Sequence, residues 1–205
     1  MTNLLPSDIR VAVSSEDQEA VVDRLNSFVL QLRRGLYRLP VETARELIQN
    51  LPAIKHPLEK VAAWEALEFS PPFPEFLTAG MEWLKNPRND ARAQALGTVL
   101  SVFPDQRDPL IKIYENETDQ FMRYAIARSL AADRPRQAWE RLCQLVKSEP
   151  NLSMELEELI PDELADLSFA SDLPFIEQQG NLNKKTMVWT NTERILRERL
   201  KMFGN

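Results

Sequence analysis

The sequence of 205 residues is poor in the residues on which most redox and catalytic sites depend. It contains one cysteine, Cys143, so no internal disulfide can form, and a reducing cytoplasmic location is the simplest expectation. It contains one histidine, His56, and five glycines. One histidine and one cysteine do not make a usual zinc site, and five scattered glycines do not make a phosphate-binding loop. The sequence therefore predicts no metal, no cofactor and no catalytic centre.

Neither His56 nor Cys143 stands in a pattern that is typical of catalysis. His56 lies in the segment Ala-Ile-Lys-His-Pro between two predicted helices, and nothing beside it supplies a nucleophile or an orienting acid. We interpret it as an exposed loop residue. Cys143 lies among aliphatic residues of an amphipathic helix, where nothing favours a thiolate. We interpret it as a structural thiol and expect the protein not to be an enzyme.

Long hydrophobic runs and a positive charge balance are also missing. No apolar run approaches the roughly 18–20 residues that span a bilayer, and residues 1–13 lack the features of a signal peptide. The net charge of −6 argues against a general binder of nucleic acid or of anionic membranes. Residues 184–205 hold six basic and two acidic residues, whereas residues 150–172 hold seven acidic residues and no Lys or Arg. Nucleic-acid contact through the basic C-terminal helix is therefore an alternative, although the acidic body would oppose it.

Fourteen prolines are present, and four of them mark a period. Pro40, Pro72, Pro104 and Pro135 are separated by 32, 32 and 31 residues. Proline ends a preceding helix and suits the first turn of the next one. The period therefore predicts about four helical hairpins over residues 15–150, after an N-terminal extension at 1–14.

Three segments upstream of these prolines share one helical pattern. Each segment begins with a basic residue. Small or apolar residues stand three and four residues after it, and an aliphatic residue stands seven residues after it. The segments are Lys60–Leu67, Arg92–Val99 and Arg123–Leu130. Small residues on that face let neighbouring helices approach closely, so we expect burial of Ala95, Leu96, Ile126 and Ala127. The predicted antiparallel pairs are 57–70 with 73–85, 90–103 with 105–116, and 118–132 with 136–148.

The pattern becomes irregular after residue 150, and residues 151–205 are predicted to form an acidic helical segment, a loop and a basic C-terminal helix. Two short helices are expected on either side of Pro161, at 154–160 and 162–169, followed by a loop at 170–185. The last helix is expected at about 191–203, because Thr190 and Glu193 have capping-box spacing. Trp189 would pack just ahead of this helix. The apolar face of the last helix consists of Leu196, Leu200 and Phe203. This face predicts that the helix caps the preceding repeats.

Residues 90–149 resemble short bacterial HEAT-like repeats. The resemblance lies in Arg92-Ala-Gln-Ala-Leu-Gly97, in the loop Pro104-Asp105, in the helix Pro109–Tyr114 and in the segment Arg123–Leu130. The period is nearer the 34 residues of tetratricopeptide repeats than the roughly 40–47 of HEAT repeats. However, Arg92 and Arg123 stand where the tetratricopeptide family places alanine. The resemblance implies an all-α fold, an α-solenoid of about four hairpins with a C-terminal capping helix.

An α-solenoid presents a groove lined by one helix from each repeat, so we expect a non-catalytic protein-binding, scaffold or adaptor module. The polar residues predicted to line this groove form a stripe that is acidic toward its N-terminal half. Such a stripe suits a partner protein with a basic segment. HEAT-like scaffolds also carry enzymes, and a phycobilin lyase-like protein remains an alternative, whereas alkylpurine DNA glycosylases need a cationic groove. The polar residues predicted to line the groove are Glu42, Arg45, Gln49, Glu75, Glu82, Asp108, Lys112, Glu115 and Glu140.

Overall fold

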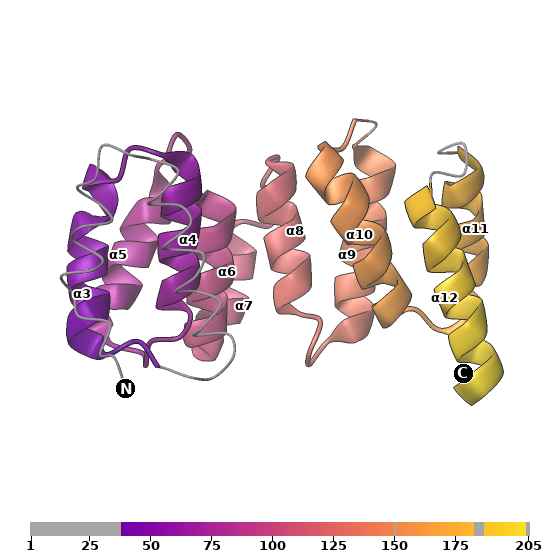
Figure 1. Ribbon diagram of the computed structural model, residues 1–205, viewed down its shortest axis with the longest axis horizontal. Helices are drawn as coiled ribbons and strands as arrows, with labels where there is room; N and C mark the ends of the chain where they lie inside the picture. The colour runs from indigo at the N-terminus through magenta and orange to yellow at the C-terminus, as the bar shows by residue number, and fades with distance from the viewer. Residues whose placement is uncertain (1–37, 150, 183–186, 204–205) are drawn as a thin grey trace. The chain divides into compact units, whose positions relative to one another are not determined.

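The computed structural model of the protein describes residues 38–149, 151–182 and 187–203, without the side chains of Met187 and Phe203. These ranges contain α-helices, short 3-10 helices and no strand, which confirms the all-α class. The extension predicted at 1–14 and the start of the first predicted hairpin lie outside the described residues. The chain divides into two compact units, residues 1–116 and 117–205, which are described separately below (Figure 1).

Unit 1 contains five described α-helices, and prolines stand at the start of several of them. Pro57 and Pro74 are the first residues of their helices, and Pro40 is the N-cap of α3. Helix α6 packs against both α4 and α5, while α3 packs against the same two helices. The helices are α3 (Val41–Asn50), α4 (Pro57–Leu67), α5 (Pro74–Lys85), α6 (Arg92–Val102) and α7 (Arg107–Ile113), with 3-10 turns at Leu51–Ala53 and Pro104–Gln106.

The core of unit 1 is rich in aromatic side chains. Phe76 is fully buried, and its ring centroid lies 5.4 Å from that of Phe103 and 6.3 Å from that of Trp64. Helices α5 and α6 lie close together at Gly80, where a Cβ atom would stand 2.5 Å from a methyl carbon of Val99. Glycine is therefore required at this contact by the space between the helices. The predicted burial of Ala95 and Leu96 on α6 is confirmed.

A network of hydrogen bonds fixes the turn between α5 and α6. The Trp83 indole donates to the Asp90 carbonyl at 3.0 Å, and the Asn89 amide donates to the Trp83 carbonyl at 2.8 Å. Lys60 of α4 forms an ion pair with Asp90 at 2.7 Å. Ala91 follows with φ of 59°, a left-handed conformation that is costly for a residue with a Cβ atom. The network thus holds this turn in an unfavourable backbone geometry from which α6 begins.

Unit 2 contains five α-helices in its described residues. Helix α8 packs on α9, and α9 packs on α10. Helix α12 packs against both α10 and α11, as the orange and yellow ribbons of Figure 1 show. Ile126 and Ala127 of α8 are buried, as predicted. The helices are α8 (Gln120–Ser129), α9 (Pro135–Ser148), α10 (Met154–Leu167), α11 (Leu173–Leu182) and α12 (Met187–Phe203), with a 3-10 turn at Ala170–Asp172.

Three boundaries predicted for the C-terminal region are wrong. Helix α10 runs without a break through Pro161, where two helices were expected. The predicted loop at 170–185 contains the 3-10 turn and α11. Helix α12 begins at Met187, so Thr190 lies inside it and is not its N-cap. In each case burial against neighbouring helices outweighs a local signal, because α10 buries residues on both sides of its proline and α12 buries Trp189.

The expected apolar contact of the last helix is present. Leu196 is fully buried and Leu200 is half-buried, while the Phe203 side chain lies outside the description. Thr192 is fully buried one turn before Leu196. Arg199 adds a polar contact, because its guanidinium donates to the carbonyl of Asp166 at 3.0 Å and to that of Ser168. Helix α12 is therefore an integral part of unit 2, and one of its arginines satisfies carbonyl groups where α10 ends.

Candidate functional site

All nine side chains of the predicted groove stripe are exposed. Eight of them belong to unit 1 and one, Glu140, to α9 of unit 2. The structure brings together Arg45 of α3 and Glu75 of α5, which form an ion pair at 3.3 Å. The Arg45 guanidinium also lies 5.4 Å from the centre of the Phe73 ring. Glu82 pairs with Lys85 along α5, and Glu140 pairs with Arg136 along α9 at 3.3 Å. Several stripe residues therefore make local ion pairs.

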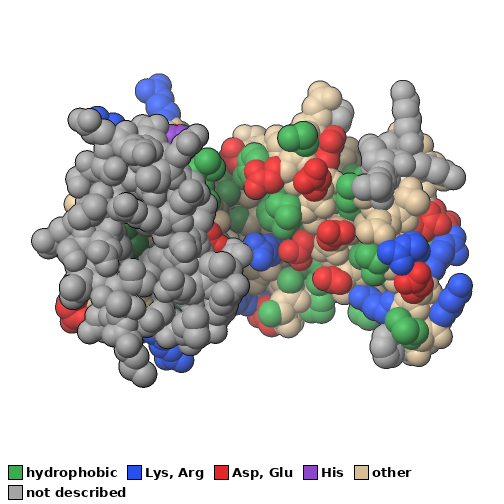
Figure 2. All heavy atoms as spheres, viewed as in Figure 1, with side chains coloured by type: hydrophobic (Ala, Val, Ile, Leu, Met, Phe, Trp, Pro, Cys, Tyr) green, Lys and Arg blue, Asp and Glu red, His purple; other side chains and the backbone are tan. Residues whose placement is uncertain are grey.

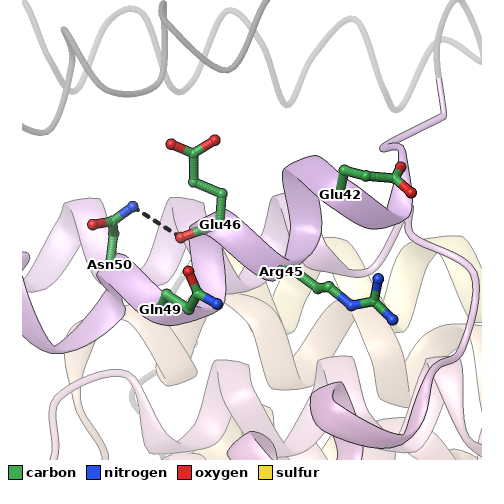
Figure 3. Close-up of a pocket in the computed structure, with 5 residues that line it drawn as sticks. All are labelled: Glu42, Arg45, Glu46, Gln49 and Asn50. Carbon is green, nitrogen blue, oxygen red and sulfur yellow. Dashed lines mark hydrogen bonds between the residues drawn. The ribbon is translucent and has the colours of Figure 1, made fainter.

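One part of the stripe lines a polar hollow of about 560 Å³ on α3. The side chains follow one another at helical spacing along a single helix, and Figure 3 shows that the Glu46 carboxylate and the Arg45 guanidinium point in different directions. The Asn50 amide donates to the Glu46 carbonyl at 2.9 Å. The described side chains of the hollow thus do not converge on one point, as the groups of a reaction centre do. Its lining residues are Glu42, Arg45, Glu46, Gln49 and Asn50.

A second depression, which we call the α10 groove, lies within unit 2. Its volume is about 320 Å³, and its walls come from α9, α10, α11 and α12. Leu156 and Ile160 on its α10 side are fully buried, and Trp189 of α12 is 5% exposed. The lining is mostly apolar: Val146, Glu149, Leu152, Met154, Leu156, Glu157, Glu158, Ile160, Pro161, Gln179, Leu182, Val188 and Trp189.

Two large apolar side chains of the α10 groove are open to solvent. Met154 is 78% exposed and Leu182 is 67% exposed. Leu159 of α10 adds further exposed apolar surface, although it does not line the groove. Single exposed apolar residues are ordinary on a protein surface, but a group of them beside an apolar depression is typical of an interaction site.

Carboxylates accompany this apolar surface on α10. Glu157 and Glu158 line the groove, and Glu155, Asp162 and Asp166 are exposed on the same helix. Among the described residues no salt bridge joins any of these five carboxylates to a basic side chain. The described residues that line the groove include no Lys or Arg. Figure 2 shows Asp and Glu side chains interspersed with hydrophobic ones over the face of unit 2 where α10 lies.

The remaining acidic residues of this region have partners. The Arg136 guanidinium donates two hydrogen bonds to the buried Asp172 carboxylate, at 2.8 and 2.9 Å, and this bonding raises the pKa of Arg136 above its ordinary value. Glu163 accepts a hydrogen bond from the Tyr124 hydroxyl at 3.3 Å and lies 3.5 Å from Arg128. Carboxylates without a basic partner among the described residues therefore lie along α10, and two of them, Glu157 and Glu158, line the groove.

The arginines of α12 do not neutralise that charge. Arg194 pairs with Glu198 at 2.9 Å, and Arg197 pairs with Glu193 at 2.9 Å and with Glu177 of α11. Arg199 is bonded to the backbone carbonyls at the end of α10. The charges of the C-terminal helix are thus used mainly within α12 and in its contacts with α10 and α11.

His56 and Cys143 both have structural positions. The His56 Nδ1 atom accepts a hydrogen bond from the Leu58 backbone N–H at 3.3 Å, so the half-buried imidazole is the N-cap of α4. The expected position of His56 between two helices is confirmed, but the residue is half-buried rather than exposed. Cys143 is 3% exposed, and burial raises the pKa of its thiol to about 12, which leaves it protonated and unreactive at neutral pH.

The described part of the chain holds no cluster of three or more His, Cys, Asp or Glu residues placed to bind a metal ion. In the same part, no helix combines the length and the apolar character that crossing a membrane requires.

Comparison with family models, curated proteins and solved structures finds no match for this chain. The resemblance to HEAT-like repeats therefore rests on the residues quoted for it above.

Sequence reasoning identified the acidic stretch 150–172 but not the α10 groove. Exposed Met154 and Leu159 beside Glu157 and Glu158 were a local signal that could have drawn attention to this helix. The groove itself was not predictable in this way, because its other walls come from α9, α11 and α12, and α11 was interpreted as a loop.

Proposed function

We propose that this protein is a non-catalytic protein-binding module whose helical hairpins stack as a HEAT-type α-solenoid. The packing within each unit supports this arrangement. In unit 1, α6 contacts the two preceding helices, and in unit 2 the pair α8 and α9 is followed by α10 packed on α9. Contacts of this kind between successive hairpins are the units from which solenoids are built.

The α10 groove is the observation that carries the proposal. An apolar depression with exposed Met154 and Leu182 at its edge is unfavourable in water, and burial of such side chains yields roughly 1.5–3 kcal/mol each. No pair of groups among the described lining residues has the arrangement of a nucleophile and a base. Binding a partner is therefore the use that this surface supports best.

The exposed stripe on α3 and α5 is a second contact surface in this proposal. Its charged residues can form ion pairs with a partner at the edge of an interface, where they affect specificity and association rate more than affinity. Nucleic-acid binding through α12 is not proposed, because the arginines of that helix are already engaged within unit 2.

Site-specific photo-crosslinking in the source cells tests the proposal. A photoreactive amino acid would replace Gln49 or Lys112 in the stripe, or Leu182 in the groove. Exposed residues outside both surfaces, Lys55 and Ala132, serve as controls. We expect discrete crosslinked protein species from at least one test position and none from the controls. Folded variants that yield no protein crosslink at any test position would overturn protein binding as the function, as would identical crosslinks from test and control positions.

A further inference from the structure

The α10 groove combines an apolar floor with an acidic border, and together these features select one class of occupant. We propose that it binds a basic amphipathic helix of a partner protein, with apolar side chains in the groove and Lys or Arg side chains opposite Glu157 and Glu158. This inference rests on the proposed protein-binding function and specifies the chemistry of the partner.

The apolar part of the groove fits side chains rather than a large ligand. Its volume of about 320 Å³ stands at the lower end of the roughly 300–1,000 Å³ that small-molecule sites occupy. Leu156 and Ile160 form a fixed part of the lining, since both are fully buried. Met154 is exposed and unbranched, so it can adjust to the shape of an incoming apolar group. These properties favour the apolar anchors of a peptide.

The negative charge at the border of the groove determines which charge the partner must carry. Glu157 and Glu158 line the groove, no described basic residue pairs with them, and the described lining residues include no Lys or Arg. Asp162 and Glu155 extend the negative charge along α10. Such a border attracts cations and repels phosphates, fatty-acid carboxylates and acidic peptides. The combination of apolar and cationic groups is found in a basic amphipathic segment.

The C-terminal helix of this chain is a wall of the groove and not its occupant. Val188 and Trp189 of α12 line the groove, and Trp189 is held with 5% exposure in the packing of unit 2. The arginines of α12 face Glu177, Glu193, Glu198 and the carbonyls at the end of α10. The arginines of α12 are therefore engaged away from Glu157 and Glu158.

A helical occupant follows from the surroundings of the groove. In the described residues no strand is present whose edge could pair with an extended peptide. A depression between packed helices is the usual receptor for one face of an amphipathic helix, with anchors at positions i, i+3 or i+4, and i+7.

Binding of defined peptides to the full-length protein tests this inference. The probe is a fluorescein-labelled helical peptide of Leu and Lys with all leucines on one face. One comparison peptide replaces every Lys by Glu, and a second keeps the Leu/Lys composition but scatters the leucines around the helix. Fluorescence anisotropy should show saturable binding of the first peptide and at least about tenfold weaker binding of the other two, a difference of the size that one lost anchor or charge pair produces.

Matched variants locate the binding site. Met154→Ala and Leu182→Ala should each weaken the Leu/Lys peptide by about fivefold or more, whereas Met202→Ala, at a 69% exposed methionine outside the groove, should have no effect. Glu157→Gln with Glu158→Gln should weaken it by about tenfold. The same variant should flatten the salt dependence, since raising ionic strength from 0.1 to 1 M shortens the screening length from about 10 Å to about 3 Å. Glu155→Gln with Asp166→Asn removes the same charge from exposed α10 positions that do not line the groove and should have a smaller effect.

Equal binding of the Leu/Glu peptide would overturn the assignment of a basic partner. Equal losses in the groove variants and their matched controls would overturn the assignment of the site. Absence of peptide binding, together with a cellular crosslink at Gln49, Lys112 or Leu182, would overturn this inference and leave the protein-binding function standing. Absence of every cellular crosslink would instead remove the proposed function itself.

Discussion

The two units bury their helices by different means. In the described part of unit 1, helices α4, α5 and α6 enclose aromatic rings, with Trp64 and Phe76 fully buried and Gly80 allowing close approach. In unit 2 the core also contains aromatic residues, Tyr124, Trp139 and Trp189, but directional polar contacts connect its irregular parts. The buried Trp139 indole donates to Ser168 at 2.8 Å, and the Arg136 guanidinium lies 4.2 Å from the centre of the Trp139 ring.

The difference follows from the regularity of the chain. Helices in regular hairpins satisfy their backbone groups internally, so their contacts depend on the fit of side-chain volumes. The link between α10 and α11 is not regular, and its backbone groups need other partners. The Asp172 carboxylate accepts from the Phe169 N–H at 2.9 Å, and Arg199 donates to the Ser168 carbonyl. The link between α10 and α11 thus depends on particular charged and polar side chains, as the turn between α5 and α6 does in unit 1.

The largest effect is expected from removing the central contact of α12. Leu196→Ala deletes a fully buried side chain and should lower the free energy of unfolding by about 2–5 kcal/mol. Met202→Ala alters an exposed residue of the same helix and should change it by less than about 0.5 kcal/mol. Chemical denaturation of the full chain measures both. Equal stability of the two variants would mean that α12 does not contribute to unit 2.

Breaking the polar link tests whether unit 2 depends on direction as well as burial. Asp172→Asn leaves the size of the side chain unchanged but weakens the hydrogen bonds from Arg136, and it should cost about 1.5–3 kcal/mol. Glu140→Gln removes the exposed partner of the same arginine and should cost less than about 1 kcal/mol. Thermal and urea denaturation compare the stabilities of the two variants. If Asp172→Asn leaves the stability unchanged, apolar packing alone maintains this region.

A pair of glycine substitutions tests whether unit 1 depends on shape. Gly80→Ala places a Cβ atom 2.5 Å from Val99 and should cost about 1–3 kcal/mol through overpacking. Gly97→Ala, in the neighbouring helix α6, meets no atom within 4 Å and should gain about 0.5–1 kcal/mol because alanine is the better helix former. Opposite signs in denaturant unfolding confirm the close approach of α5 and α6; equal signs would contradict it.

The smallest expected effect is a loss of stability at alkaline pH. It comes from two buried acidic side chains of unit 2, Tyr124 and Cys143. Burial, with a contribution from Glu163, raises the pKa of Tyr124 from 10.0 to about 12, and burial raises that of Cys143 from 9.0 to about 12. The folded state therefore keeps protons that the unfolded chain releases, so their contribution is full below pH 9 and is lost as the pH rises toward 12. Melting temperatures measured across this range should fall, and less steeply in Tyr124→Phe and Cys143→Ala. An unchanged slope in both variants would contradict this origin.

Local signals located the regular part of the chain well. The repeating prolines stand at or near helix starts at Pro40, Pro104 and Pro135, and the small residues Ala95 and Ala127 are buried as their spacing required. The C-terminal region was less predictable, since Pro161 and the capping-box spacing at Thr190 are local signals that packing overrides. The α10 groove depends on four helices that are separated along the chain, so no local pattern could define it.

The sequence by itself determined the all-helical class, the places where the regular helices begin, and the uneven distribution of charge. These properties depend on backbone chemistry and on the period of apolar residues, which act over a few residues. Tertiary structure decided which carboxylates have partners. Asp172 meets Arg136 across 36 residues of sequence, whereas Glu157 and Glu158 meet no described basic residue and border an apolar groove. Whether a charge is neutralised or left available to a partner depends on distances of a few ångströms between helices, which only the packed fold sets.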